Sequence, residues 1–181
     1  MSSTQAQPFD LLLELEQRYR RRGEGGGDAQ QSGEVIAGRL VLRCGPWFLS
    51  LTMDQVAEIM PLPRYTRVPG VRAWLLGIAN LRGRVITVVD LGHFLRGEAS
   101  RRTAASRIIV AESEEWRYGL LVDEVIGLRH FSDDAVKPPG PALDSVVRPY
   151  VMAVLQGEGK EWLAFNINTL LKNEKFLDAS V

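Results

Sequence analysis

The sequence contains a single cysteine, Cys44, so no disulfide can form within the chain. Cys44 follows the apolar run Leu40–Leu42, and buried free cysteines usually behave as small hydrophobic side chains. We therefore expect this thiol to have a packing role rather than a catalytic one.

The sequence also shows no signal for targeting or for a membrane-spanning helix. The start Met-Ser-Ser-Thr-Gln shows no basic segment followed by an apolar core, so no secretory signal is predicted. The apolar runs are far shorter than the ~20 residues that a membrane helix needs. We expect a cytoplasmic protein with no direct membrane insertion.

An excess of either charge is absent as well. The chain has 22 basic and 22 acidic residues, which give a formal net charge of +0. Nucleic-acid-binding domains usually carry a basic excess or stripe, whereas the densest basic runs here, 18–22 and 101–102, are typical of solvated surface. With 45% hydrophobic and 24% charged residues, the composition favours a soluble globular domain that binds no nucleic acid.

The sequence shows no arrangement of residues typical of an enzyme or a metal site. His93 and His130 are the only histidines, and no cluster of Cys and His has the spacing of metal ligands. A Gly-x-Ser-x-Gly nucleophile elbow is missing too. The acidic pairs at 123–124 and 133–134 are adjacent in sequence, so within a strand their side chains would point to opposite faces. We predict no enzymatic activity, no cofactor and no metal.

From residue 35 onward, the hydrophobic pattern has a period of two. Turn residues separate the apolar segments every 8–12 residues or so, which indicates about ten short strands in a barrel or sandwich. The predicted strands and extended segments are 35–43, 47–52, 65–68, 74–79, 84–91, 107–112, 118–122, 125–131, 150–156 and 161–166. A helical turn or strand edge is expected at 54–59, a short helix around Phe94, a loop at 137–141 and a closing helix at 169–175. The tryptophans Trp47, Trp74, Trp116 and Trp162 are expected in the core.

The N-terminal residues show a different period. Residues 8–22 have the spacing of an amphipathic helix, with one face formed by Phe9, Leu12, Leu13, Glu16 and Tyr19. Residues 23–33 include the run Gly-Glu-Gly-Gly-Gly and are predicted to be a flexible linker. A phosphate loop would require a preceding strand and a Gly-Lys-Ser/Thr ending, and both are missing. The helix has two possible roles: packing on its own barrel, or docking to a partner.

One segment carries the strongest functional signal. Residues 77–91 read Gly-Ile-Ala-Asn-Leu-Arg-Gly-Arg-Val-Ile-Thr-Val-Val-Asp-Leu. Asn80 and Gly83 are turn residues that flank Arg82. A tight turn would project this guanidinium outward, with five donors in a rigid fork that suits a carboxylate on a partner. The alternative is an ion pair within the chain, with Glu58 or Asp90.

This segment resembles the central signature of the CheW-like domain. The segments 56–59, 68–70, 108–110 and 119–125 match the rest of the family pattern in consistent order, so the resemblance covers 35–175. It implies a mainly β fold of two SH3-like five-stranded barrels, with a short N-terminal helix and a C-terminal helix. A faint internal echo, in which 56–59 is similar to 122–125, is what two similar barrels would produce. The implied organisation is a helix and linker at 1–34, the CheW-like domain at 35–175 and a tail at 176–181.

The resemblance also implies a function. Family members are adaptors that couple the cytoplasmic tip of methyl-accepting chemoreceptors to the regulatory domain of a CheA-type histidine kinase, in arrays attached to the membrane. Matched position by position, the partner-binding residues are Val56, Glu58, Gly77, Asn80, Arg82 and Gly83. Arg82 is expected to make the polar contact with Glu58 as its support, Val56 to make an apolar contact, and Gly77 to permit close approach of backbone.

A finer resemblance rests on three further segments. The segments 8–12, 63–71 and 176–178 are similar to the family members that serve type IV pilus twitching motility. A flagellar chemotaxis array is the alternative, and a barrel reused as a small enzyme or a nucleic-acid binder is the third reading. One departure is Thr87, where many members carry proline; threonine keeps the strand donor that proline removes.

Overall fold

The computed structural model describes residues 37–113 and 116–180. The predicted helix at 8–22 lies outside these residues. The strands are β1 (Arg39–Cys44), β2 (Trp47–Thr52), β3 (Glu58–Met60), β4 (Leu75–Leu81), β5 (Arg84–Asp90), β6 (Arg107–Glu112), β7 (Arg117–Val122), β8 (Glu124–Arg129), β9 (Val136–Lys137), β10 (Val151–Gly157) and β11 (Lys160–Phe165). The helices are α2 (Leu91–Arg96), α3 (Ile167–Leu171) and α4 (Glu174–Leu177), with 3-10 turns η1 (Met53–Gln55), η2 (Asp133–Ala135) and η3 (Arg148–Tyr150).

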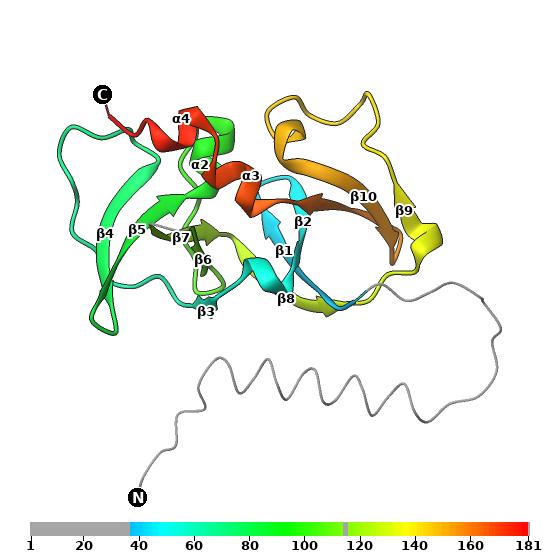
Figure 1. Ribbon diagram of the computed structural model, residues 1–181, viewed down its shortest axis with the longest axis horizontal. Coiled ribbons are helices and arrows are strands. Elements are labelled where there is room, and N and C mark those ends of the chain that lie inside the picture. Colours follow the sequence, from blue (N-terminus) through cyan, green and yellow to red (C-terminus); the bar gives the residue numbers. More distant parts are fainter. Residues whose placement is uncertain (1–36, 114–115, 181) are drawn as a thin grey trace, which may run out of the picture.

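The strands form two curved sheets that lie side by side (Figure 1). One has five strands in the order β3-β6-β7-β5-β4, and the other has six in the order β8-β1-β2-β11-β10-β9. The predicted mainly β fold is therefore confirmed, and two sheets, one of five and one of six strands, stand where two five-stranded barrels were predicted. The sixth strand was not predicted: β9 ends at Lys137, directly before two prolines, and Lys137 is also the first residue of the segment expected to be a loop. Because β9 is an edge strand, the prolines that follow interrupt no ladder.

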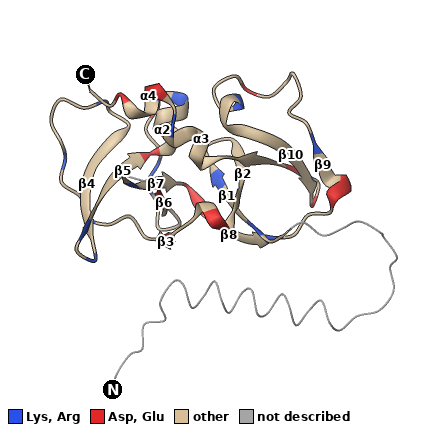
Figure 2. Cartoon of the chain, in the orientation of Figure 1, with Lys and Arg blue, Asp and Glu red and all other residues tan. Residues whose placement is uncertain are grey.

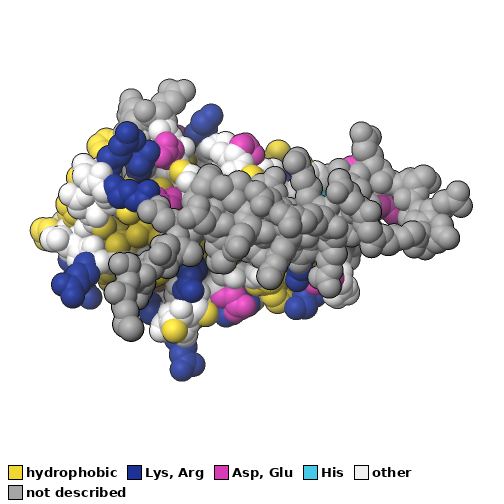
Figure 3. Space-filling view, turned by 90° about the horizontal axis from the view of Figure 1, so that it is seen from below, with side chains coloured by type: hydrophobic (Ala, Val, Ile, Leu, Met, Phe, Trp, Pro, Cys, Tyr) yellow, Lys and Arg dark blue, Asp and Glu magenta, His cyan; other side chains and the backbone are white. Residues whose placement is uncertain are grey.

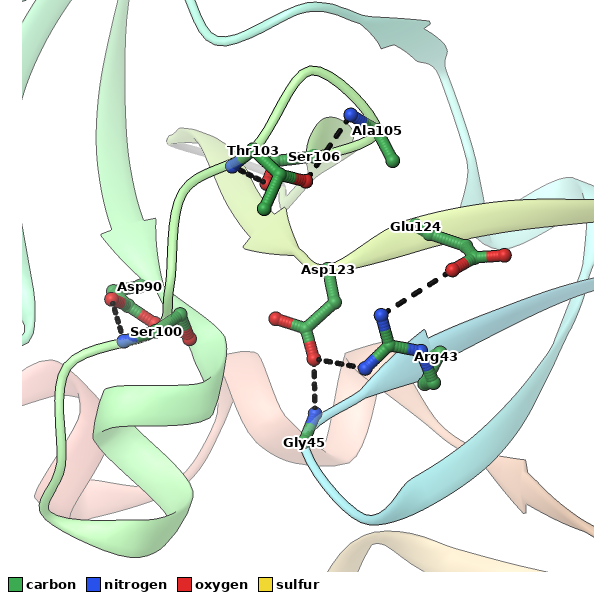
Figure 4. A network of polar contacts seen from close by, with 9 residues as sticks. All are labelled: Arg43, Gly45, Asp90, Ser100, Thr103, Ala105, Ser106, Asp123 and Glu124. Carbon is green, nitrogen blue, oxygen red and sulfur yellow. Dashed lines mark hydrogen bonds and ion pairs between the residues drawn. The ribbon is translucent and has the colours of Figure 1, made fainter.

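The chain passes from one sheet to the other at Asp123, between β7 and β8. Its Oδ2 accepts hydrogen bonds from Nη1 of Arg43 at 3.1 Å and from the backbone N–H of Gly45 at 2.7 Å. Nη2 of Arg43 also donates to Oε2 of Glu124, at 3.3 Å (Figure 4). The expectation that adjacent acids point apart was wrong here, because Asp123 lies in a bend rather than within a strand. The two carboxylates converge on one guanidinium and fix the crossing.

The largest buried cluster draws side chains from both sheets, including Leu42 and Leu49 of one and Val89 and Leu120 of the other. Trp47, Trp74 and Trp162 are buried, as predicted. The prediction for Trp116 was wrong: its side chain is 60% exposed, because it lies in the connection between β6 and β7, beyond the ends of the core strands.

The C-terminal residues form two short helices instead of the single one predicted. The break falls at Asn173, whose side chain accepts a hydrogen bond from the backbone N–H of Lys175 and so caps α4. Residues 176 and 177, placed in the tail by sequence, belong to α4. Phe176 is buried and stacks on Trp74 with ring centroids 5.6 Å apart. The end of the chain therefore helps to cover the five-stranded barrel.

Candidate partner-docking site

The β4–β5 hairpin presents Arg82 at its tip. The two turn residues, Arg82 and Gly83, both have positive φ angles, 51° and 81°, which is the pattern of a type I′ turn. Glycine is common at such positions, whereas a left-handed conformation costs about 1–2 kcal/mol for other residues. Oδ1 of Asn80 accepts a hydrogen bond from the Gly83 N–H at 2.8 Å and holds the turn closed. Arg82 is thus held in an unfavourable backbone conformation at an exposed position.

The Arg82 guanidinium is only partly used within the chain. Its Nη2 donates to Oε1 of Glu58 at 3.0 Å, while the arginine side chain is 66% exposed and the glutamate side chain 23%. No second acceptor contacts this guanidinium among residues 37–113 and 116–180. An exposed ion pair of this kind contributes at most about 1 kcal/mol to stability. Glu58 therefore orients Arg82, and most of the guanidinium donors remain available to a partner.

Asp90, the other acid that the sequence offered to Arg82, is engaged elsewhere. It is fully buried and caps α2 by accepting a hydrogen bond from the His93 N–H at 2.9 Å. It also accepts from the backbone N–H of Ser100 at 2.9 Å and from the Ser100 hydroxyl at 2.6 Å (Figure 4). Asp90 therefore anchors the chain that follows α2 and belongs to the framework of the site.

The ion pair joins the two opposite edges of the five-stranded sheet. Glu58 lies in the edge strand β3, and Arg82 follows the other edge strand, β4. A second link lies nearby, where the backbones of Thr66 and Ile78 exchange two hydrogen bonds of 2.8 and 2.9 Å. These contacts close the sheet into a barrel and place the two edges next to each other.

Gly77 makes this closure possible. Its φ angle is +150°, and a Cβ atom added there would lie 2.1 Å from the carbonyl oxygen of Thr66. The close approach of backbone expected at Gly77 is thus made by the chain's own segment around Thr66. A direct contact between Gly77 and a partner stays a prediction.

The structure brings four of the six predicted residues together at the hairpin tip. Glu58, Asn80 and Arg82 are linked there through the contacts above, together with Gly83. Val56 lies two residues before Glu58, is half-buried and packs against the main core. Its apolar contact with a partner stays a prediction.

Two apolar residues beside Arg82 were not identified from the sequence. Ile78 is 41% exposed and Val85 is 65% exposed. Val85 lies directly opposite Asn80 across the β4–β5 ladder, so these side chains share the outer face of the hairpin. We call Ile78, Asn80, Arg82 and Val85 the hairpin face. Hydrophobic and basic side chains lie together at the end of the molecule formed by this barrel (Figure 3).

Other chemistry finds no support in the described part of the chain. Residues 37–113 and 116–180 contain no group of three His, Cys, Asp or Glu side chains arranged to hold a metal. In the same residues, no helix has the length and apolar character to cross a membrane. Burial raises the pKa of the Cys44 thiol, and the nearby charge of Asp123 raises it further, so the sulfur stays protonated and unreactive.

Comparison with known proteins decides the family. The family model for the CheW-like domain matches residues 40–175. The chain belongs to the CheW-like domain family. This places the chain among the CheW-like scaffold or coupling proteins, the general class that the resemblance implied.

Individual relatives support the same assignment. The chain is 36% identical to Protein PilI of Pseudomonas aeruginosa over 181 residues, which covers 100% of both proteins and confirms the finer resemblance. It is 29% identical to Chemotaxis protein CheW of Rhizobium meliloti over 136 residues, 75% of this chain and 88% of that protein. A crystal structure of the scaffolding protein TtCheW from Thermoanaerobacter tengcongensis has the same fold, with a TM-score of 0.66 and 24% identity over 76% of this chain and 94% of that one.

Proposed function

We propose that this CheW-like protein is a non-enzymatic adaptor that couples methyl-accepting chemoreceptors to a CheA-type histidine kinase. The observation that carries the proposal is the hairpin face, where an arginine with unused donors is held on a rigid turn beside exposed apolar side chains. Arginine is one of the residues enriched among those that dominate the binding energy of protein interfaces, and surrounding side chains that exclude water support it.

The chemistry of the hairpin face defines the partner surface that it fits. A carboxylate of the partner would accept hydrogen bonds from the free N–H groups of Arg82. Charge-assisted hydrogen bonds of this kind are about twice as strong as neutral ones. Ile78 and Val85 would cover apolar side chains next to that carboxylate. Glu58 would stay bound to Arg82 on the other side and keep the guanidinium oriented toward the partner.

The array we propose is the one that controls type IV pilus twitching motility. The similarity to PilI extends over the whole chain, including residues 1–39, whereas the Rhizobium meliloti CheW matches 75% of it. An adaptor of this kind would act in the cytoplasm, at membrane-anchored receptors. A flagellar chemotaxis array is the alternative.

The adaptor function predicts that this protein makes kinase binding to receptors possible. Vesicles that display a receptor cytoplasmic domain are mixed with the CheA-type kinase of the same system, with and without this protein, and sedimented. We expect kinase to sediment with the vesicles only when the protein is present, because neither partner alone supplies the bridge. Receptor and kinase pairs from the pilus and flagellar systems of the same genome are compared side by side. The adaptor function would be refuted if the protein raised the bound kinase with neither pair.

A further inference from the structure

A groove opens on the six-stranded sheet, and none of the hairpin-face residues lines it. It has a volume of about 330 Å³, and its walls come from the start of β1, from η1, from β9 and β10, and from the residues before α3. Arg39, the first residue of β1, lines this groove together with Asp54. The start of β1 therefore lies beside the groove.

The rim of the groove carries exposed apolar side chains. Met152 is 65% exposed and Val136 is 40% exposed, and both line the groove. Met53, next to Asp54 in η1, is 38% exposed. Methionine is adaptable and is used at surfaces that receive apolar helices. A surface of this composition is typical of a binding site for an amphipathic segment.

Acidic residues stand next to these apolar ones. Asp133 and Asp134 form η2, directly before Val136, and both are exposed (Figure 2). Within the described residues neither makes an ion pair. Within the groove the charge of Asp54 acts on Arg39, so the negative charge beside the groove comes from Asp133 and Asp134. This charge favours an occupant that is apolar on one side and basic at one end.

Residues 8–22 of the same chain have both properties. Their spacing predicts an apolar helical face with Phe9 and Tyr19 near its two ends, and arginines stand at positions 18, 20, 21 and 22. A flexible linker as long as the stretch between Arg22 and Arg39 would have a root-mean-square span of about 20–25 Å, enough to let the segment reach the groove. We propose that residues 8–22 dock in this groove, with their apolar face on Met152 and Val136 and their arginines toward Asp133 and Asp134.

Docking there would place the segment beside a predicted partner-binding position. Asp54 and Gln55 line the groove, and Val56 follows them directly in the chain. Occupation of the groove does not depend on the adaptor function and is measured without any partner.

Paramagnetic broadening in the full-length chain tests the docking. Gln17→Cys introduces a site for a nitroxide label on the predicted helix; native Cys44 is only 1% exposed, so it does not compete for the label. The methyl groups of methionine carry ¹³C. We expect the methyl signals of Met53 and Met152 to be broadened by the label, and about 1 M salt, where the screening length is about 3 Å, to restore part of their intensity.

Matched variants decide whether the broadening arises from docking of residues 8–22 in the groove. Met152→Glu places a charge in the groove and is expected to restore the Met53 signal, whereas Val85→Glu, at a residue of the hairpin face that is also 65% exposed, is expected to leave it broadened. Unbroadened Met53 and Met152 signals, or a Met53 signal that Met152→Glu does not change, would overturn the proposal. A mixture of nitroxide-labelled chains with separate ¹³C-methionine chains identifies the other occupant: broadening in that mixture would assign the groove to a second copy instead.

Discussion

Gly77→Ala is expected to lower the free energy of unfolding by about 3 kcal/mol or more. The new methyl group would lie 2.1 Å from the Thr66 carbonyl oxygen, in a backbone conformation that L-residues rarely adopt. Backbone strain of this kind costs about 1–3 kcal/mol, and each of the two Thr66–Ile78 hydrogen bonds contributes about 0.5–1.5 kcal/mol. Urea unfolding followed by tryptophan fluorescence measures the loss.

Gly70→Ala is the matched control for this substitution. Gly70 also has a positive φ angle, +70°, but nothing lies within 4 Å of its missing Cβ. Strain alone then costs about 1–2 kcal/mol. Equal losses in the two variants would contradict the close approach at Gly77.

Arg82→Asn is expected to separate stability from binding. Asparagine followed by glycine is the preferred pair in a type I′ turn, so the strain at Arg82 is relieved. The lost ion pair with Glu58 offsets this by at most about 1 kcal/mol. We expect the free energy of unfolding to stay the same or rise by up to about 1 kcal/mol, and the affinity for the kinase or receptor to fall about tenfold or more.

Thermal unfolding and a binding titration on the same sample measure both effects. The opposite result is a variant that is clearly less stable but binds its partners normally. It would show that Arg82 serves only to stabilise the contact between the β4–β5 turn and β3. Stability and binding that fall together would leave folding as the cause of the binding loss, and would count against the hairpin face as a docking surface.

The strands could be predicted because apolar and polar residues alternate along a strand that buries one of its faces. The run from Val85 to Val89 was recognised as a strand from its β-branched residues, and the structure places β5 there. Which side of that strand faces out could not be read from the run, since apolar residues occupy both faces. Val85 is 65% exposed whereas Ile86 is fully buried, so the hairpin face was missed.

Contacts between distant segments could not be predicted from the sequence for a different reason. The convergence of Asp123 and Glu124 on Arg43 depends on a bend where the chain changes sheets, and no local period marks such a bend. Arg82 and Glu58 were named as a possible pair, but the alternative, Asp90, was excluded only once its burial as the cap of α2 was visible. The positions of the two acids in the fold, rather than the local sequence around them, determine which one pairs with Arg82.

The most direct test of the docking site is the affinity of this protein for the regulatory domain of its CheA-type kinase and for its receptor tip, measured for Arg82→Glu and Arg84→Glu. Arg84 is a close control because it is exposed, lies two positions away and makes no ion pair in the described residues. Both substitutions change the net charge equally. If the hairpin face docks a partner, Arg82→Glu weakens binding to one of the two partners by about tenfold to a hundredfold, while Arg84→Glu changes it by less than about threefold. Equal effects of the two substitutions, or no effect of either on both partners, would contradict docking at the hairpin face.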